Sequence, residues 1–124
     1  MKSGRTLFTI VTVTYNSSKW VKNAIESVLA SDYASFEYII ADDCSSDETW
    51  EIISTYSDSR IRKFRHEQNR GEYANRNFAL HKATGDYLLF VDGDDELYKD
   101  ALSKLATYVG QFPDAGSIWG VPSN

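Results

Sequence analysis

Apolar residues along the chain gather in short runs that predict β-strands. Phe8–Thr14 is almost wholly β-branched, and Tyr38–Ala41 and Tyr87–Val91 are two further short apolar runs, so each is typical of a buried strand. Ile61–Arg65 alternates between apolar and charged residues, which favours a short strand near a sheet edge. Ser117–Val121 has the composition to begin one more strand.

The stretches after the first two runs have helical spacing. From Lys19 to Ser31 apolar residues recur on one face of a helix, and Trp20 is interpreted as the first core residue of that face. A second apolar stripe continues to about Ser57. Ser45 and Glu48 precede it at the spacing of a capping box, so we expect this helix to begin there.

Two more helices are expected later in the chain. Glu72–Ala83 follows the turn Asn69–Gly71, contains no proline and has a good helical composition. Gly85 is suited to a left-handed cap at its end. The last helical stripe runs from Ala101 to Phe112 and is closed by a segment that begins with Pro113.

The alternation of strands and helices predicts an α/β layered fold with a mainly parallel sheet and right-handed crossovers. In such sheets, ligands bind outside the carboxyl ends of the strands. Three polar clusters, Tyr15-Asn16, Asp42-Asp43 and Asp92–Asp95, each follow a predicted core strand, and Asn69–Gly71 stands at the start of a helix. We therefore expect the four clusters to meet on one rim of the sheet.

Composition narrows the class of protein. The 124 residues suffice for one domain with a core, and the net charge of −5 argues against a general nucleic-acid binder. The single cysteine, Cys44, excludes an internal disulfide and suggests no cysteine zinc site. His66 and His81 lack metal-ligand spacing and are expected to be solvated or semi-buried, without catalytic work. Without a signal peptide's apolar core or a membrane span of about 20 apolar residues, a cytoplasmic location is expected, with any contact to the inner face of a membrane made by other regions.

The acidic cluster after the last predicted strand suggests a metal site. Asp92 and Asp94 can direct carboxylate oxygens at one point while Gly93 leaves the backbone free to bend. Mg²⁺ is usually held by one or two carboxylates together with substrate phosphates. Asp94 is predicted as the direct ligand and Asp92 as its support. A simple acidic turn is the alternative, whereas a calcium loop is excluded because the sixth and twelfth loop positions carry no glycine and no glutamate.

The other clusters supply groups that a nucleoside diphosphate would need. Asp43 can accept an N–H from a base such as uracil, and Tyr15 can form an aromatic wall. The helix start after Gly71 offers backbone donors to an anion, and Arg70 and Arg76 can pair with phosphate.

Each of these residues also has a purely structural interpretation. Tyr15 can serve only to form the turn, and Arg76 can belong to a surface or structural ion pair. Asp42 is expected to hydrogen-bond a neighbouring loop. Cys44 is expected to be a small, partly buried filler.

Taken in order, these motifs resemble inverting glycosyltransferase family 2, whose members have the GT-A fold, a three-layer α/β sandwich with a mainly parallel central sheet. The resemblance implies that Val13 and Tyr15 line the nucleobase pocket, that Asp43 binds the base, usually uracil, and that Gly71 approaches the donor. Asp92 and Asp94 match the family's Asp-x-Asp motif for Mn²⁺ or Mg²⁺. The matching stretches are Thr12–Asn16, Ile39–Asp47, Asn69–Gly71, Ala74–Asn77 and Ala83–Asp95.

The implied reaction transfers a sugar from a nucleotide-diphosphate donor, most often a UDP-sugar, to a saccharide or glycoconjugate acceptor with inversion. In this family the acceptor-binding part and the catalytic base follow the donor-binding part. Residues 1–124 are therefore expected to be a donor-binding part without the acceptor-binding part, and the base is expected beyond Asn124. The flank of the sheet left exposed predicts low stability or self-association.

Two other functions stay open at this point. One is a non-catalytic module that binds a nucleotide sugar or a protein. The other is a phosphotransferase or phosphatase with an aspartyl nucleophile. Against the second, Asp92-Gly93-Asp94-Asp95 comes late in the chain and has neither Thr nor Val directly after its second aspartate.

Overall fold

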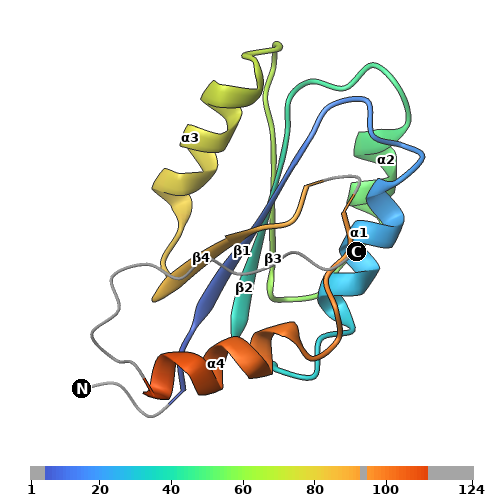
Figure 1. The fold of residues 1–124 in the computed structure, drawn as a ribbon. Coiled ribbons are helices and arrows are strands. Elements are labelled where there is room, and N and C mark those ends of the chain that lie inside the picture. The colour runs from blue at the N-terminus through green and yellow to red at the C-terminus, as the bar shows by residue number, and fades with distance from the viewer. Residues whose placement is uncertain (1–4, 93–94, 112–124) are drawn as a thin grey trace.

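A four-stranded parallel sheet forms the centre of the structure, which is a computed structural model that describes residues 5–92 and 95–111 (Figure 1). Its strands are β1 (Phe8–Thr14), β2 (Phe36–Asp42), β3 (Ile61–Arg65) and β4 (Tyr87–Phe90). The bounds of the first and third confirm the prediction. The second begins two residues earlier than predicted and ends one residue later, and the fourth ends one residue earlier.

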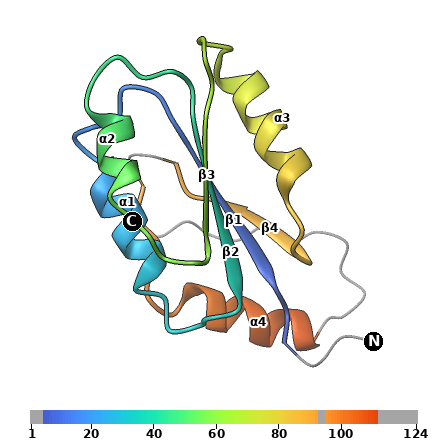
Figure 2. The ribbon, with the colours of Figure 1, turned by 180° about the vertical axis from the view of Figure 1, so that it is seen from behind.

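Four helices cover the two faces of this sheet: α1 (Val21–Leu29), α2 (Thr49–Ser54), α3 (Glu72–Lys82) and α4 (Ala101–Gln111). Helices α1, α2 and α4 contribute buried side chains to one core cluster, whereas α3 packs alone on the opposite face (Figures 1 and 2). The predicted three-layer α/β sandwich is therefore confirmed.

The side-chain alternation of β1 explains why both faces of the sheet are covered. Phe8 and Ile10 lie in the cluster with α1, α2 and α4, while Val11 and Val13 lie in the cluster with α3. Successive residues of a strand point to opposite faces. A run that is β-branched at nearly every position thus supplies apolar contacts to both layers, which makes β1 a buried strand.

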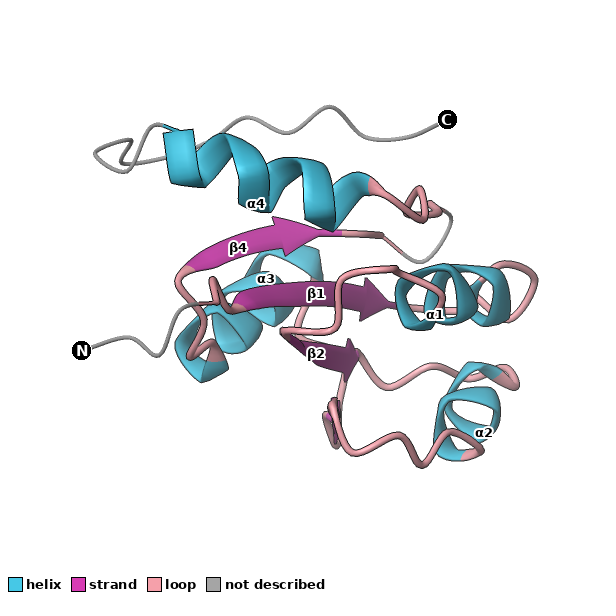
Figure 3. Ribbon diagram, turned by 90° about the horizontal axis from the view of Figure 1, so that it is seen from below, coloured by secondary structure: helices cyan, strands magenta, loops and turns pink. Residues whose placement is uncertain are grey.

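The order of the strands is β3-β2-β1-β4, and it determines where a crevice can open at the edge of the sheet. The chain moves outward from β1 to β2 and β3, and then crosses to the other side of β1 to form β4. Seen from below, β1 lies between β2 and β4 (Figure 3). Such a reversal opens a crevice at the carboxyl ends of the strands on either side of it, here β1 and β4.

The structure corrects three expectations about the helices. Trp20 directly precedes α1 and is 49% exposed, so it is not a core residue. The capping box is wrong: the residue before α2 is Glu48, whose side chain makes no capping bond, and the Ser45 hydroxyl donates to Asp42 instead. The N–H of Thr49, the first residue of α2, donates to Asp47 Oδ1 at 2.9 Å. Gly85 does not adopt a left-handed conformation.

Gly85 has a different use, which is the close approach of two backbones. A Cβ atom at Gly85 would lie 2.6 Å from Thr9 Oγ1 and 2.7 Å from the Thr9 nitrogen.

The expected last strand at Ser117–Val121 and the end of the α4 stripe at Phe112 fall outside the described residues. Within 5–92 and 95–111, no helix is long and apolar enough to cross a membrane.

Candidate functional site

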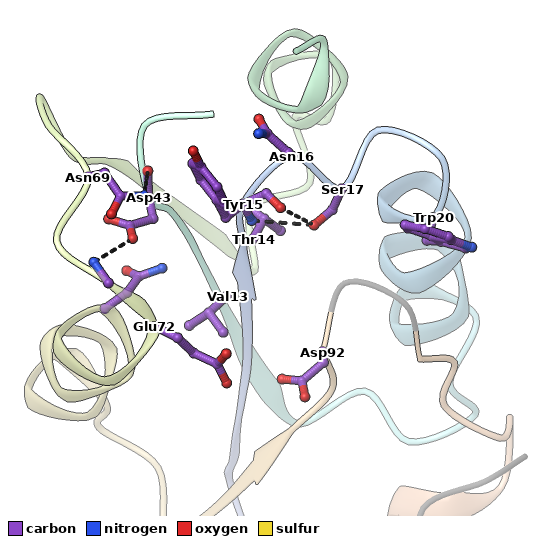
Figure 4. A pocket seen from close by; sticks show the side chains of 12 residues that line it. Val13, Thr14, Tyr15, Asn16, Ser17, Trp20, Asp43, Asn69, Glu72 and Asp92 are labelled. Carbon is purple, nitrogen blue, oxygen red and sulfur yellow. Dashed lines mark hydrogen bonds between the residues drawn. The ribbon is translucent and has the colours of Figure 1, made fainter. Parts of the chain in front are cut away.

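A pocket of about 530 Å³ opens at the carboxyl ends of the strands. It brings together five of the residues predicted from the sequence: Val13, Tyr15, Asp43, Gly71 and Asp92. Figure 4 shows Val13 and Tyr15 at the end of β1, Asp43 after β2 and Asp92 after β4. Gly71 directly precedes α3. The other described lining residues are Thr14, Asn16, Ser17, Trp20, Asn69, Glu72 and Asn75.

Asp42 and Asp43 have separate environments because they are consecutive at the end of β2. Asp42 is fully buried and accepts hydrogen bonds from the hydroxyls of Thr14 and Ser45 at 2.7 and 2.6 Å. Asp43 faces the start of α3 and the pocket instead. Side-chain alternation accounts for the division, and the predicted loop-bonding role of Asp42 is confirmed.

Asp43 also holds the turn that begins α3, a role that the sequence did not reveal. Its two carboxylate oxygens accept the backbone N–H groups of Arg70 at 2.8 Å and of Gly71 at 2.9 Å. Gly71 has a φ of 92°, which residues with a side chain rarely adopt. Each carboxylate oxygen has a second lone pair, so Asp43 can also accept a hydrogen bond from a ligand in the pocket.

Side chains join the loops after β1 and β2. Asn16 donates its backbone N–H to the Ser45 hydroxyl at 2.9 Å, and its own Oδ1 accepts the backbone N–H of Ser46 at 2.8 Å. Ser17 donates its N–H to the Thr49 hydroxyl at 2.8 Å. Asn16 has a φ of 50°, a backbone conformation that such local bonds compensate. Tyr15 is thus carried on a braced loop, with a side chain that is 52% exposed.

The end of β4 is supported from inside the core. The Thr12 hydroxyl donates to the carbonyl oxygen of Val91 at 2.5 Å, and the Tyr38 hydroxyl lies 2.7 Å from the same Thr12 oxygen. Burial raises the pKa of Tyr38, against the opposing effect of the Thr12 bond, so Tyr38 remains a protonated donor. Because Val91 immediately precedes Asp92, this chain of bonds positions the backbone of the predicted metal ligand.

Arg76 lies among the carboxylates at the α3 side of the pocket. Its Nη2 is 2.7 Å from Asp92 Oδ1 and 3.0 Å from Glu72 Oε2. Partial burial lowers the pKa of Arg76, but the Asp92 and Glu72 carboxylates more than offset it, so the pKa is raised and the guanidinium stays charged. The ion-pair interpretation of Arg76 is therefore confirmed.

The donor chemistry of the pocket fits a hard divalent cation. Asp43, Glu72 and Asp92 line it, and none of its described lining residues is Lys or Arg. Arg76 offsets part of this negative charge through its pairs with Asp92 and Glu72, and a bound cation would further favour an anionic ligand. The ion pair between the Arg76 guanidinium and Asp92 indicates that a positive charge is favourable beside this carboxylate. Asp94 lies outside the described residues, and no three His, Cys, Asp or Glu side chains within 5–92 and 95–111 form a metal-binding cluster.

Several pocket residues were not predicted as such. Trp20 lines the pocket at its α1 end and is exposed. Its place in the predicted helical stripe did not indicate this position. Asn75 is buried on α3, with Nδ2 bonded to the carbonyl of Ala41 and Oδ1 2.8 Å from His66 Nε2. His66 is 5% exposed and therefore buried, so the expectation of a solvated or semi-buried residue is wrong. In the sequence, Asn75 stands between the apolar residues Ala74 and Phe78 of the predicted helix, and a polar residue in that place could have indicated a buried hydrogen-bonding side chain.

Comparison with known proteins gives a consistent family. The model of the family described as "Glycosyl transferase family 2" matches residues 9–123. A Bacillus subtilis (strain 168) protein named as a teichuronic acid biosynthesis glycosyltransferase, TuaG, is 35% identical over 97% of this chain and 48% of its own length. The poly(ribitol-phosphate) beta-N-acetylglucosaminyltransferase TarS of Staphylococcus aureus (strain Mu50 / ATCC 700699) is 33% identical over 84% of this chain and 19% of its own length.

Solved structures agree with the fold. The crystal structure of S. aureus TarS 1-349 in complex with UDP-GlcNAc superposes with a TM-score of 0.80 at 33% identity, over 84% of this chain and 31% of that one. A Pyrobaculum calidifontis mannosyltransferase in complex with GDP-Man and Mn²⁺ has a TM-score of 0.77 at 23% identity, which supports the fold alone. The chain thus spans about half or less of the length of these relatives.

Proposed function

The chain belongs to glycosyltransferase family 2, and we propose that it is the donor-binding part of an enzyme that transfers a sugar from a UDP-sugar to a saccharide or glycoconjugate acceptor with inversion. The observation that carries the proposal is the convergence of Asp43, Tyr15, Gly71 and Asp92 on one pocket at the switch point of the sheet. Its volume, about 530 Å³, is within the range of roughly 300–1,000 Å³ that is common for small-molecule sites.

The nucleoside is assigned to the end of the pocket near α3. Asp43 would accept the N–H of uracil through the lone pairs that Arg70 and Gly71 do not use. Val13 is nearly buried and Tyr15 is half-exposed, so the two offer an apolar and an aromatic wall to the base. A relative, TarS, has been crystallised with UDP and with UDP-GlcNAc.

The diphosphate is assigned to the neighbourhood of Asp92. Asp92, together with Asp94, would hold Mn²⁺ or Mg²⁺, and a cation bound there supplies Lewis-acid stabilisation of the charge that builds on the leaving diphosphate. The backbone at Gly71 begins α3, and the positive end of the helix dipole favours the same anion. Arg76 adds a guanidinium, 24% exposed, within reach of Asp92.

The acceptor and the catalytic base are assigned to sequence beyond Asn124. In an inverting transfer, the acceptor hydroxyl attacks the sugar from the side opposite to the diphosphate while a carboxylate removes its proton. We assign this base to none of the described carboxylates, because those of the pocket serve the donor. A cytoplasmic location, where nucleotide sugars would reach the site, remains a prediction.

Titration calorimetry with UDP, with and without Mn²⁺, tests the donor site. We expect weak binding of UDP alone, tighter binding with Mn²⁺, and loss of only the metal-dependent gain in Asp94→Ala. Asp43→Ala should weaken UDP binding even without metal. Absence of UDP binding by protein shown to be folded, with and without Mn²⁺, would refute the assignment.

A matched pair of ligands separates recognition of the base from recognition of the phosphates. Inorganic pyrophosphate with Mn²⁺ should bind wild type and Asp43→Ala with similar affinity, whereas uridine should distinguish them. If Asp43→Ala affected UDP only when metal is present, its role in base recognition would be wrong. A non-catalytic binding module would give the same binding results, so hydrolysis or transfer of the UDP-sugar by the longer protein decides between it and the enzyme.

A further inference from the structure

Arg76 connects two carboxylates that both belong to the pocket wall. Its Nη2 lies 2.7 Å from Asp92 Oδ1, while Nε and Nη2 lie 3.1 and 3.0 Å from Glu72 Oε2. The guanidinium carbon is 4.8 Å from the centroid of the Phe90 ring. Arg76 is therefore held by two acidic groups and an aromatic face, directly beside the residue assigned to the metal.

The contact with Asp92 is additional to an ion pair within α3. Glu72 and Arg76 are four residues apart and form the pair that supports the helix by itself. The bond to Asp92 instead reaches from α3 to the residue that follows β4 and Val91, 16 positions along the chain. It holds the side chain of Asp92, which is 41% exposed.

A divalent cation and a guanidinium cannot share Asp92 without repulsion. A diphosphate removes the conflict, because its oxygens accept the paired N–H groups of arginine in the fork geometry that arginine favours. The guanidinium is then free to leave Asp92 for the ligand while the cation takes the carboxylate.

We propose that Arg76 is an exchangeable counter-ion of the donor site, which neutralises Asp92 in the absence of donor and transfers to the diphosphate when the metal and donor bind. This inference rests on the proposed function, since it requires a diphosphate ligand. Its consequence is that the metal alone binds weakly and that metal and nucleotide strengthen each other. By linkage, each tightens the other by the same factor.

The test measures Mn²⁺ binding to the chain from the electron paramagnetic resonance signal of free Mn²⁺, with and without UDP. In Arg76→Met, Mn²⁺ alone should bind about fivefold to tenfold tighter than in wild type, the effect expected from removing one competing charge near the surface. The gain in Mn²⁺ affinity on adding UDP should shrink by at least the same factor, since Arg76 no longer pairs with the diphosphate.

Two further variants make the result specific. Arg76→Lys keeps the positive charge that competes for Asp92 but lacks the paired N–H groups of arginine. Mn²⁺ alone should therefore bind as in wild type, while the gain in Mn²⁺ affinity on adding UDP should be reduced. Arg60→Met removes a remote ion pair with Asp58 and should change neither quantity. Unchanged or weaker Mn²⁺ binding by folded Arg76→Met would overturn the proposal, as would a lysine variant that behaves like the methionine variant.

A measurement on wild type covers the case in which Arg76→Met does not fold. The arginine Nε–H resonance of Arg76 should shift strongly when Mg²⁺ and UDP are both present, and little with Mg²⁺ alone. An unchanged resonance with both ligands bound would overturn the proposal. If wild type bound no UDP, the proposed function would fail by itself, while Mn²⁺ binding to Arg76→Met would still test the competition for Asp92.

Discussion

Removing the Thr12 hydroxyl tests whether the core supports the acidic end of β4. Thr12 Oγ1 donates to the Val91 carbonyl at 2.5 Å, so its single proton is used there and the Tyr38 hydroxyl must donate to it. Thr12 and Tyr38 are fully buried. Thr12→Val keeps the shape of the side chain, which makes it a clean removal of one oxygen.

The expected loss follows from the groups left without partners. Thr12→Val deprives both the Tyr38 hydroxyl and the Val91 carbonyl of a hydrogen bond. With about 1–3 kcal/mol for each of these two buried groups left unsatisfied, we expect the free energy of unfolding to fall by about 2–6 kcal/mol. For a chain of this length, that lowers the melting temperature by roughly 6–30 °C. Tyr38→Phe should cost only about 1 kcal/mol, because the bond from Thr12 to Val91 remains.

A double-mutant cycle distinguishes this network from a loss of packing. Urea denaturation followed by circular dichroism should show that the double variant loses less than the sum of the single variants, by about 1 kcal/mol, because the hydroxyl of Tyr38 is no longer stranded. The metal-dependent part of UDP binding should weaken in Thr12→Val, since Val91 leads into Asp92. A loss below about 0.5 kcal/mol in Thr12→Val, or strictly additive effects, would refute the reasoning.

Three other predictions concern the turn, the pH dependence and the sheet edge. Gly71→Ala should cost about 1–3 kcal/mol, because φ is 92° there, and should weaken UDP binding in calorimetry by turning the N–H donor away from Asp43; an unchanged affinity would contradict this. Arg60 lowers the pKa of Asp58 to about 2 from 3.8, so the stabilisation is complete above pH 3.8 and is lost as the pH falls towards 2; urea titrations of wild type and Asp58→Asn should therefore converge over that interval, and a constant difference would be inconsistent with the pair. Because β4 is an unpaired edge among the described strands, sedimentation should show concentration-dependent self-association; a monomer at every concentration would count against it.

Much of the fold was predictable because its signals are local. The β-branched residues of β1 have few alternatives to a buried strand, and the charges of β3 are compatible with the edge position that it occupies. The meeting of Asp43, Tyr15 and Asp92 followed from parallel strands alone, since their carboxyl ends share one edge.

Some features could not be predicted, because a competing bond, the start of a helix or a distant contact decides them. Trp20 fits a helical stripe, but spacing cannot show that α1 begins after it. Ser45 fits a capping box, yet the buried Asp42 carboxylate takes its hydroxyl. The tight contact at Gly85 is with Thr9, 76 residues earlier. Only the contact of Gly85 is with a residue distant in sequence, since Asp42 lies three positions before Ser45.

The adjacent aspartates at the end of β2 have a consequence for changes in chain length. Inserting or deleting a single residue inside β2 would reverse the facing of every later position in the strand. The carboxylate that is bonded to the loops and the carboxylate that faces the pocket would then exchange surroundings, although the composition of the site would be unchanged. We therefore expect natural or engineered length variation to be accepted in the surface loops but rejected between Phe36 and Asp43, a constraint that no scan of single substitutions would reveal.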